Sequence, residues 1–329
     1  MNIEKLPSGS YRVRKMINKK SYKFTFDHEP SEKEILLKMS ELMDDVIDAD
    51  HIPFEVAAKE YCKLKKNVIS PSTYREYLNT PSRLSDSFNS LYIDKITQLH
   101  IQQEINRLAA DKSPKTVRNY HAFIVSVLKM YRPDFIANTT LPVKKPNSVY
   151  IPTDDEVKRL MEYAKTHCEG RYYIPIALAC YGLRRGEICA LEPDDIKNNI
   201  VYINKDKVYN SDKEWIIKQM PKTEKSVRAI PIFPELADMI IKQGYVYDGH
   251  PNNISDFIKD ACNELQIQHF SIHKLRHYFC SRLSSENIDI ATIMALGGWK
   301  TDYVLRTTYR HEVSQKVQEA SDKLSNIIF

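Results

Sequence analysis

The sequence lacks the patterns that mark several common classes of enzyme. Its eight glycines form neither a GxxxxGKS/T nor a GxGxxG pattern, which disfavours nucleotide-driven chemistry on a phosphate-binding loop or a dinucleotide fold. Its six cysteines are scattered and form no CxxC pair, so neither a disulfide framework nor a zinc ribbon is expected at this length. We expect these thiols to be reduced and mostly buried.

Long hydrophobic runs are absent as well. The longest nearly apolar stretch, residues 172–183, is too short to cross a bilayer and is typical of a buried helix. The N-terminal segment lacks the apolar core of a signal peptide. We therefore expect no membrane segment and a cytoplasmic location.

Metal-binding patterns are also sparse, with no HExxH sequence. His273 and His277 stand four residues apart, where two metal ligands could sit, but Arg276 lies between them and no third ligand is nearby. The acidic pairs at 154–155 and 194–195 are typical of helix caps and first-turn charges. The sequence therefore predicts neither a metal nor a cofactor.

What the sequence does contain is an uneven distribution of positive charge. The chain has 329 residues, 42% hydrophobic and 28% charged, as in ordinary globular proteins, and its length suggests two domains with a small third. The net charge of +5 is too small to establish a nucleic-acid partner by itself. However, residues 1–27 hold seven Lys and Arg against two acids, and residues 61–131 hold eleven against five. This excess predicts that the N-terminal part binds a polyanion.

The first 48 residues predict a small basic module. Residues 8–27 alternate, with Phe24 and Phe26 on one face, and predict a hairpin that turns at "INKK". Apolar residues at helical spacing then predict a helix over 31–48.

Residues 52–135 predict a helical bundle, because Ser, Thr or Pro signals precede the periodic segments at short loops. The expected helices, the second bending at Pro81, span 53–66, 70–88, 97–111 and 113–131. Basic residues cluster near the ends of these helices and, with two more in the hairpin, are the candidates for DNA contact. A solvated face and a phosphate-binding face explain the bundle cluster equally well. The candidates are Arg12, Arg14, Lys63, Lys65, Lys66, Arg75, Lys115 and Arg118.

A proline-rich linker over 132–153 leads to a second domain, residues 150–329. Strand-like runs at 199–205, 214–220 and 226–232 predict one small antiparallel sheet, with turns at "SDK" and "TEK". Helices are expected at 153–166, 170–182, 184–191, 234–243, 253–265, 273–285, 288–296 and 312–325.

This second domain also holds a set of residues suited to one reaction. A phosphodiester attacked by an oxygen nucleophile develops negative charge on its non-bridging oxygens, which arginine forks bind bidentately. His and Trp can add hydrogen bonds, Tyr can be the nucleophile, and Lys can protonate the leaving hydroxyl. The covalent bond keeps the energy of the broken phosphodiester, so the reaction needs no ATP.

The motifs "GLRRGE", "PKT", "HKLR" and "GGW", followed by a Tyr, stand in that order between residues 182 and 309. In this they resemble the tyrosine recombinases, or phage integrases. The resemblance implies a mostly α fold with small antiparallel β-sheets. Its parts would be an N-terminal β-hairpin-helix arm module, a helical core-binding bundle and an α+β catalytic domain.

The resemblance also implies roles for individual residues. The GxRxxE pattern makes Arg184, rather than Arg185, the first catalytic arginine, with Glu187 supporting it. Lys222 would be the general acid, and Tyr309 the nucleophile, because Tyr303 follows the Trp too closely. The implied catalytic set is Arg184, Lys222, His273, Arg276, Trp299 and Tyr309. His277 would be structural, and Trp299 stands where many members of the family have His.

We therefore predict a site-specific DNA recombinase that forms a 3′-phosphotyrosine and integrates or excises a phage or mobile element. By resemblance, its partners are double-stranded DNA attachment sites, three further copies in a homo-tetramer on DNA, and a DNA-bending accessory protein. The C-terminal helix would dock on a neighbouring copy, although packing on its own domain is nearly as well supported. Two alternatives stay open: a type IB topoisomerase-like activity that cleaves and religates without exchange, and a non-catalytic DNA-binding regulator.

Overall fold

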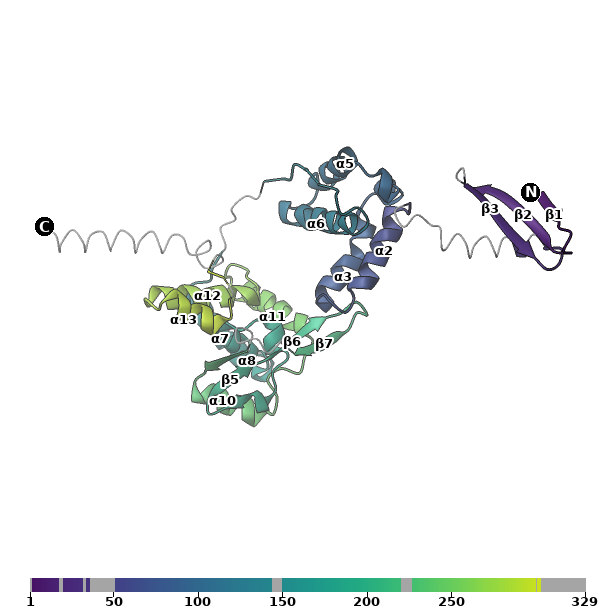
Figure 1. Cartoon of the computed structure of the whole chain (residues 1–329). Helices are drawn as coiled ribbons and strands as arrows, with labels where there is room; N and C mark the ends of the chain where they lie inside the picture. The colour runs from purple at the N-terminus through teal and green to yellow at the C-terminus, as the bar shows by residue number, and fades with distance from the viewer. Residues whose placement is uncertain are drawn as a thin grey trace. The chain divides into compact units, whose positions relative to one another are not determined.

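The computed structural model describes residues 2–17, 20–31, 34–35, 51–143, 150–219, 227–299 and 301–302 (Figure 1). The chain divides into two compact units, Met1–Lys144 and Lys145–Phe329. The finer division of the first unit into 1–48 and 52–135 remains a prediction.

The N-terminal segment forms a three-stranded antiparallel sheet rather than a bare hairpin. Its strands, in sheet order, are β1 (Asn2–Lys5), β2 (Tyr11–Ile17) and β3 (Lys20–Phe26). The four-residue β1 is too short to show a clear alternation, so the sequence did not reveal it. Val13 and Phe24 are cross-strand partners and are buried with Ile35. Arg12 and Arg14 therefore lie on the opposite face.

Of the helix predicted over 31–48, the structure describes only Ser31, Glu34 and Ile35, and the last two are helical. The rest of that prediction lies outside the described residues.

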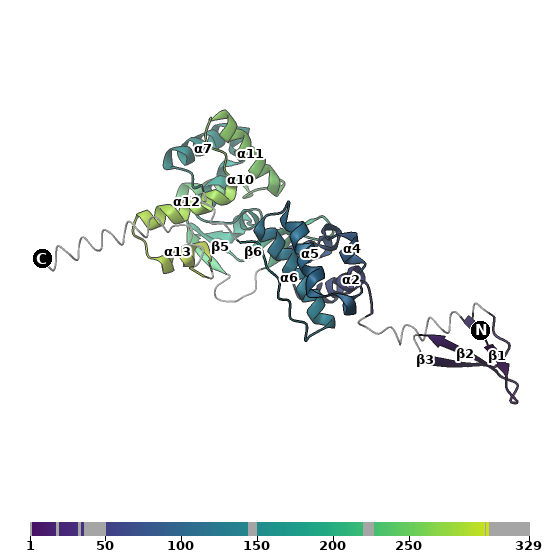
Figure 2. The ribbon, with the colours of Figure 1, turned by 90° about the horizontal axis from the view of Figure 1, so that it is seen from above.

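The bundle follows the predicted order, with α5 and α6 side by side (Figure 2). Phe54, Ile101 and Ile124 are among the residues of its buried core, and Ser70, Thr97 and Ser113 cap their helices as predicted. Its helices are α2 (Phe54–Lys65), α3 (Pro71–Asn79), α4 (Asp86–Asn89), α5 (Gln98–Ala109) and α6 (Pro114–Tyr131).

The prediction of one bent helix over 70–88 is wrong. Helix α3 ends at Asn79, and Pro81 begins a short 3₁₀ turn instead. Proline has no N–H to continue the helix, and its ring clashes with the preceding turn. Ser85 then caps α4 by accepting a hydrogen bond from the Phe88 N–H, so the break at Pro81 lets a second helix start.

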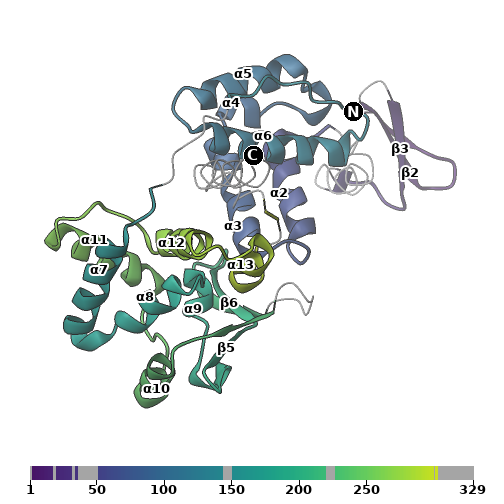
Figure 3. The ribbon, with the colours of Figure 1, turned by 90° about the vertical axis from the view of Figure 1, so that its left-hand side faces the viewer.

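The second unit is mostly helical, and the apolar run at 172–183 becomes α8, most of which is buried as predicted. Helix α12 packs against both α8 and α13, while β6 lies beside the short α9 (Figure 3). The helices are α7 (Asp154–Thr166), α8 (Tyr173–Cys180), α9 (Arg185–Ile188), α10 (Pro234–Gln243), α11 (Pro251–Glu264), α12 (Ile272–Ser285) and α13 (Ile290–Gly297).

The described strands of the second unit form two sheets, not the single sheet predicted. One sheet has the order β4 (Ile196–Lys197), β5 (Ile200–Ile203), β8 (Arg228–Pro231), and the other pairs β6 (Lys205–Tyr209) with β7 (Trp215–Gln219). Val201 faces Ile230 across β5 and β8, and both are buried in the core. No residue of β7 is fully buried, so this strand does not fit beside β5.

None of the helices in the described part of the chain combines the length and the apolar character needed to cross a bilayer.

The start of α7 offers a test of the fold. Thr153 Oγ1 accepts a hydrogen bond from the Glu156 N–H at 3.3 Å, and Glu156 Oε2 accepts one from the Thr153 N–H at 2.7 Å. We expect Thr153→Ala to lower the free energy of unfolding by about 1 kcal/mol in urea titrations, because this capping box is lost. Thr166→Ala, at the other end of α7, is the matched control. Equal losses in the two variants would contradict a capping role for Thr153.

Candidate active site

Four segments of the second unit meet at one place and bring together five of the predicted site residues. Arg184 and Glu187 lie at the start of α9, His273 and Arg276 on the first turns of α12, and Trp299 just after α13. Strand β8 supplies the fourth segment. Lys222 and Tyr309 lie outside the described residues, and so do Tyr303 and the predicted helix at 312–325.

Glu187 is the centre of this cluster, because its fully buried carboxylate accepts hydrogen bonds from two arginines. Arg184 donates to Oε2 from its backbone N–H at 2.7 Å and to Oε1 from Nη1 at 2.6 Å. Burial opposes the ionisation of Glu187, but the hydrogen bonds and positive charges of its arginine partners outweigh it, and the pKa is lowered. The support of Arg184 by Glu187, expected from the sequence, is present in the geometry.

Arg228, on β8, is the second partner of Glu187 and was not selected from the sequence. Its Nη1 and Nη2 donate to the two carboxylate oxygens at 3.0 and 2.6 Å, and its Nε donates to the Leu296 carbonyl at 2.8 Å. A signal was present in the strand pattern, because Arg228 shares a face with the buried Ile230. A charge on the buried face of a strand needs a buried partner of opposite charge.

Arg276 is the most deeply buried cation of the site, with 2% of its surface exposed. Its Nη1 donates to the Gly182 carbonyl, and its guanidinium stacks on Trp299 at 3.7 Å from the ring centroid. Burial, followed by the charge of Arg184, lowers its pKa to about 9, so it stays charged at neutral pH. Its Nη2 is buried without a hydrogen-bond partner among the described residues.

The two glycines of "GGW" allow this packing. A side chain on Gly297 would collide with the Trp299 ring, whose nearest atom is 1.6 Å from the position of an added Cβ. Gly298 ends α13 in the left-handed conformation at φ 68°, and its carbonyl accepts a hydrogen bond from Arg184 Nη2 at 3.0 Å. The motif therefore ties Trp299 and Arg184 to the same turn.

His273 lies beside the arginines on the exposed side of α12, one turn before His277. Partial desolvation, and then the charges of Arg276 and Arg184, lower its pKa. It is therefore expected to be neutral at pH 7, with one ring N–H to donate. The His277 ring meets it edge to face at 5.3 Å between centroids, consistent with the structural role predicted for His277.

This arrangement favours an anionic ligand. Arg184, Arg228 and Arg276 bring three positive charges to one carboxylate, and the Arg184 side chain is 40% exposed and so is accessible from outside. Guanidinium groups bind phosphate oxygens through paired N–H donors. Within the described residues, no group of three His, Cys, Asp or Glu side chains is placed to hold a metal ion.

The basic residues predicted to contact DNA elsewhere show mixed environments. Lys63 pairs with Glu60 at 2.7 Å, and Arg75 pairs with Glu76 at 3.0 Å. Arg118 donates to the Pro142 carbonyl at 3.2 Å, a contact that stabilises the bundle itself. Lys65 lies over the Tyr61 ring, and the remaining candidates of the bundle, Lys66 and Lys115, are exposed. Their contact with DNA stays a prediction, as does that of the two hairpin arginines.

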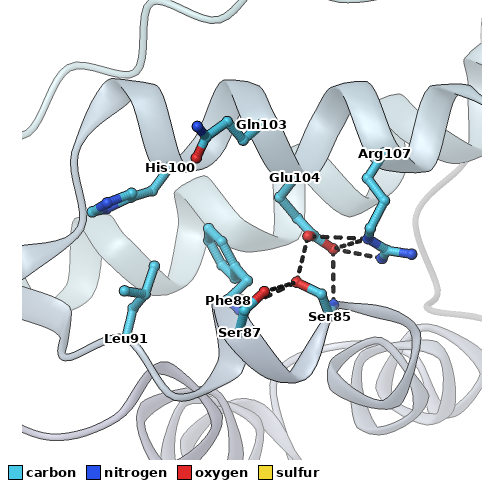
Figure 4. Close-up of a pocket in the computed structure, with 8 residues that line it drawn as sticks. All are labelled: Ser85, Ser87, Phe88, Leu91, His100, Gln103, Glu104 and Arg107. Atoms are coloured by element: carbon cyan, nitrogen blue, oxygen red, sulfur yellow. Dashed lines mark hydrogen bonds and ion pairs between the residues drawn. The ribbon is translucent and has the colours of Figure 1, made fainter.

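The bundle has a separate pocket of about 280 Å³, and the charged residues that line it are bonded to one another or to the backbone (Figure 4). Glu104 on α5 accepts hydrogen bonds from the Ser85 N–H at 3.0 Å, from Ser85 Oγ at 2.7 Å and from Arg107 Nη2 at 2.6 Å. Burial opposes its ionisation, but these partners outweigh burial and lower its pKa. The carboxylate therefore joins α4 to α5, and its oxygens are used in structural hydrogen bonds.

Both units of the chain match known protein families. Residues 152–316 match the phage integrase family, and residues 54–109 match the N-terminal SAM-like domain of phage integrases. The chain belongs to the phage integrase family. The resemblance to tyrosine recombinases seen in the sequence is thereby confirmed.

Individual relatives are distant but similar in fold. A tyrosine recombinase XerC-like protein of Caldanaerobacter subterraneus subsp. tengcongensis is 22% identical over an alignment of 307 residues, covering 77% of this chain and 76% of the relative. The Tn1549 transposon integrase in complex with transposon right end DNA has a TM-score of 0.69 at 17% identity, covering 83% of this chain and 100% of that one. A lambda integrase tetramer bound to a Holliday junction has a TM-score of 0.58 at 16% identity, covering 92% and 96%. The predicted fold class, mostly α with small antiparallel sheets, is confirmed.

His277 should make stability depend on pH. Burial, and then the neighbouring His273 and cations, lower its pKa from 6.5 to about 4, so the folded protein binds this proton less readily than the unfolded chain. This contribution to stability is complete above pH ~6.5 and is lost as pH falls toward 4. We expect His277→Gln to flatten the fall in urea midpoint over this window, and the exposed His269→Gln to leave it unchanged. Parallel pH curves for wild type and His277→Gln would contradict this expectation.

Proposed function

We propose that this protein is a site-specific DNA recombinase of the integrase type, which cleaves and rejoins DNA through a 3′-phosphotyrosine. The buried Nη2 of Arg276 is the observation that carries the proposal, because this charged donor has no hydrogen-bond partner among the described residues and lies beside the accessible Arg184. A phosphate in a DNA backbone would supply the missing acceptor. Membership of the phage integrase family supports the same reaction.

The chemistry then follows from the residue types. The Oη of Tyr309 attacks the scissile phosphorus, and the bond from phosphorus to the 5′ oxygen breaks. Arg184 and Arg276 bind the non-bridging oxygens, with His273 and the Trp299 N–H as further donors. Lys222 gives a proton to the leaving 5′ oxygen. The Tyr309 hydroxyl gives up its proton to solvent as it attacks. An ordinary Tyr has a pKa near 10, and cations close to the oxygen would favour its ionised form.

Strand exchange completes the proposed reaction. The 5′ hydroxyl of a strand from the partner site attacks the phosphotyrosine, reforms the phosphodiester and releases Tyr309. Each step exchanges one phosphate ester for another, so no nucleotide or cofactor is consumed. The integrase would work as four copies on two double-stranded attachment sites, with a DNA-bending protein as accessory. Lambda integrase, a fold neighbour, has been seen as a tetramer and as a dimer on DNA. By this proposal it acts in the cytoplasm and integrates or excises a phage or mobile element.

The two alternatives predict different products. A topoisomerase-like enzyme forms the same covalent intermediate but joins no strands between two attachment-site duplexes. A non-catalytic regulator forms no covalent intermediate at all. The filled motif positions favour catalysis over the regulator, and a strand-exchange assay separates the first alternative from the proposal.

The nucleophile is tested with a nicked suicide substrate made from the protein's own attachment site. Wild type should form a covalent protein–DNA adduct that survives denaturing electrophoresis, and Tyr309→Phe should form none, because it lacks the attacking oxygen. Tyr303→Phe removes a hydroxyl six residues away and should retain the adduct. An adduct with Tyr309→Phe would reassign the nucleophile, and no adduct with wild type would refute the catalytic proposal.

A further inference from the structure

The acceptors of Glu187 are fully used, and Arg228 uses half of them. Oε1 accepts from Arg184 Nη1 and from Arg228 Nη1, while Oε2 accepts from the Arg184 N–H and from Arg228 Nη2. A carboxylate offers about four acceptor positions, so no position is left for a second bond from the Arg184 fork. Arg184 Nη2 turns instead to the Gly298 carbonyl.

We infer that Arg228 is a positioning residue for the recombinase reaction. By saturating the buried carboxylate, it stops Arg184 from closing on Glu187 with both arms of its fork and keeps the outer edge of that guanidinium available to the scissile phosphate. Arg228 also holds the Leu296 carbonyl and packs against Gly298, where an added Cβ would lie 3.0 Å from its Nη1. It therefore fixes the turn that carries Trp299. This role rests on the proposed function and deepens it.

A positioning role and a purely structural role of Arg228 predict different cleavage kinetics. A residue that only supports folding changes how much enzyme is active, whereas a residue that orients Arg184 changes how fast each active molecule reacts. In single-turnover cleavage of the suicide substrate, the first effect lowers the amplitude and the second lowers the rate constant.

Arg228→Lys keeps the positive charge but cannot donate to both carboxylate oxygens of Glu187 with the paired geometry of a guanidinium. We expect it to lower the cleavage rate constant by at least about tenfold, while amplitude and DNA affinity stay within about threefold of wild type. Arg282→Met is the matched control, because Arg282, on α12, makes only exposed ion pairs among its described contacts, with Asp154 and Glu286. It should leave the rate constant unchanged. An unchanged rate constant in Arg228→Lys, or a loss of amplitude alone, would overturn the positioning role.

A double-mutant cycle tests the inference even where a single variant folds poorly, because it compares the effect of Arg228→Met in wild type with its effect in Glu187→Gln. Glu187→Gln removes the charge that draws Arg184 inward, so adding Arg228→Met to Glu187→Gln should slow cleavage by less than about threefold. A loss as large as that of Arg228→Met alone would overturn the inference. No adduct with wild type would refute the proposed function itself, whereas an adduct with no effect of Arg228 refutes only this inference.

Two glutamines of α5 hold the segment that leaves the bundle after α6. Gln98 accepts from the Asn138 N–H at 3.0 Å and donates to the Ile136 carbonyl. Gln102 accepts from the Thr140 N–H at 2.8 Å and donates to the Thr140 carbonyl at 3.1 Å. Each glutamine amide thus pairs with backbone as a neighbouring strand would.

The spacing of the two glutamines along α5 matches the spacing of alternate residues along an extended chain. Four residues of helix rise about 6 Å, and two residues of extended chain span about 6.6 Å. Glutamines one turn apart on α5 therefore meet alternate residues of a strand. Phe135 and Leu141 pack on the bundle core beside this contact.

We propose that this glutamine clamp, Gln98 with Gln102, is a binding face for the chain's own residues 136–141 and sets the length of the tether between the two units. With the clamp engaged, the chain leaves the bundle near Val143, which is 80% exposed, rather than at the end of α6. Release of residues 136–143 would lengthen the tether by up to ~28 Å. A longer tether lowers the effective concentration of the second DNA-binding unit once the first is bound.

The test replaces both glutamines by alanine in the full chain, with Gln103→Ala, on the same helix, as control. Hydrogen exchange at the amides of Asn138 and Thr140 should speed up at least about tenfold in the double variant only. Affinity for attachment-site DNA should fall several-fold with it. Unchanged exchange would show that the glutamines do not hold the segment, and faster exchange with unchanged affinity would show that the clamp does not set the tether.

Discussion

The buried carboxylate of Glu187 is the constraint on which the rest of the site depends. A fully buried charge is costly unless it is paired and hydrogen-bonded, and Glu187 is paired with two arginines from different elements. These bonds join the start of α9 to β8, and Arg228 extends the connection to the end of α13. The short sheet and two helices of the second unit are thereby held in one arrangement around a single acid.

The same constraint explains why we propose that the site binds an anion. Glu187 offsets one of three guanidinium charges, and Arg276 is kept from water by Trp299 and the core. Its lowered pKa reflects that burial, which a phosphate would relieve by supplying both charge and acceptors. Glu187 already holds Arg184 through hydrogen bonds, so this accessible guanidinium is oriented before a phosphate arrives.

Much of this could be predicted from the sequence, because the informative residues stand in short motifs. Gly182, Arg184 and Glu187 lie within six residues, and His273 and Arg276 share one helix face. Arg228 was missed because a lone Arg in a strand is usually exposed. Its position on the same face as Ile230 suggested burial, but its partner Glu187 stands 41 residues away in the sequence.

Errors in the predicted elements had physical causes. The three runs at 199–232 looked alike, and only burial of Val201 and Ile230 decides which two of their strands pair in the core. The break at Pro81 was read as a bend because α4 continues the helical pattern after it. Lys222 and Tyr309 lie outside the described residues, so their roles rest on the motifs and on chemistry.

The central claim is that Arg184 and Arg276 converge on one DNA phosphate. A crystal structure of the Tyr309→Phe variant with its attachment-site duplex tests it most directly, because the variant can bind DNA but cannot cleave it. The account predicts that Nη2 of Arg276 and the outer edge of Arg184 contact non-bridging oxygens of the same phosphate. A structure in which Nη2 of Arg276 turns to a protein carbonyl or to water, with no phosphate between the two arginines, would contradict it.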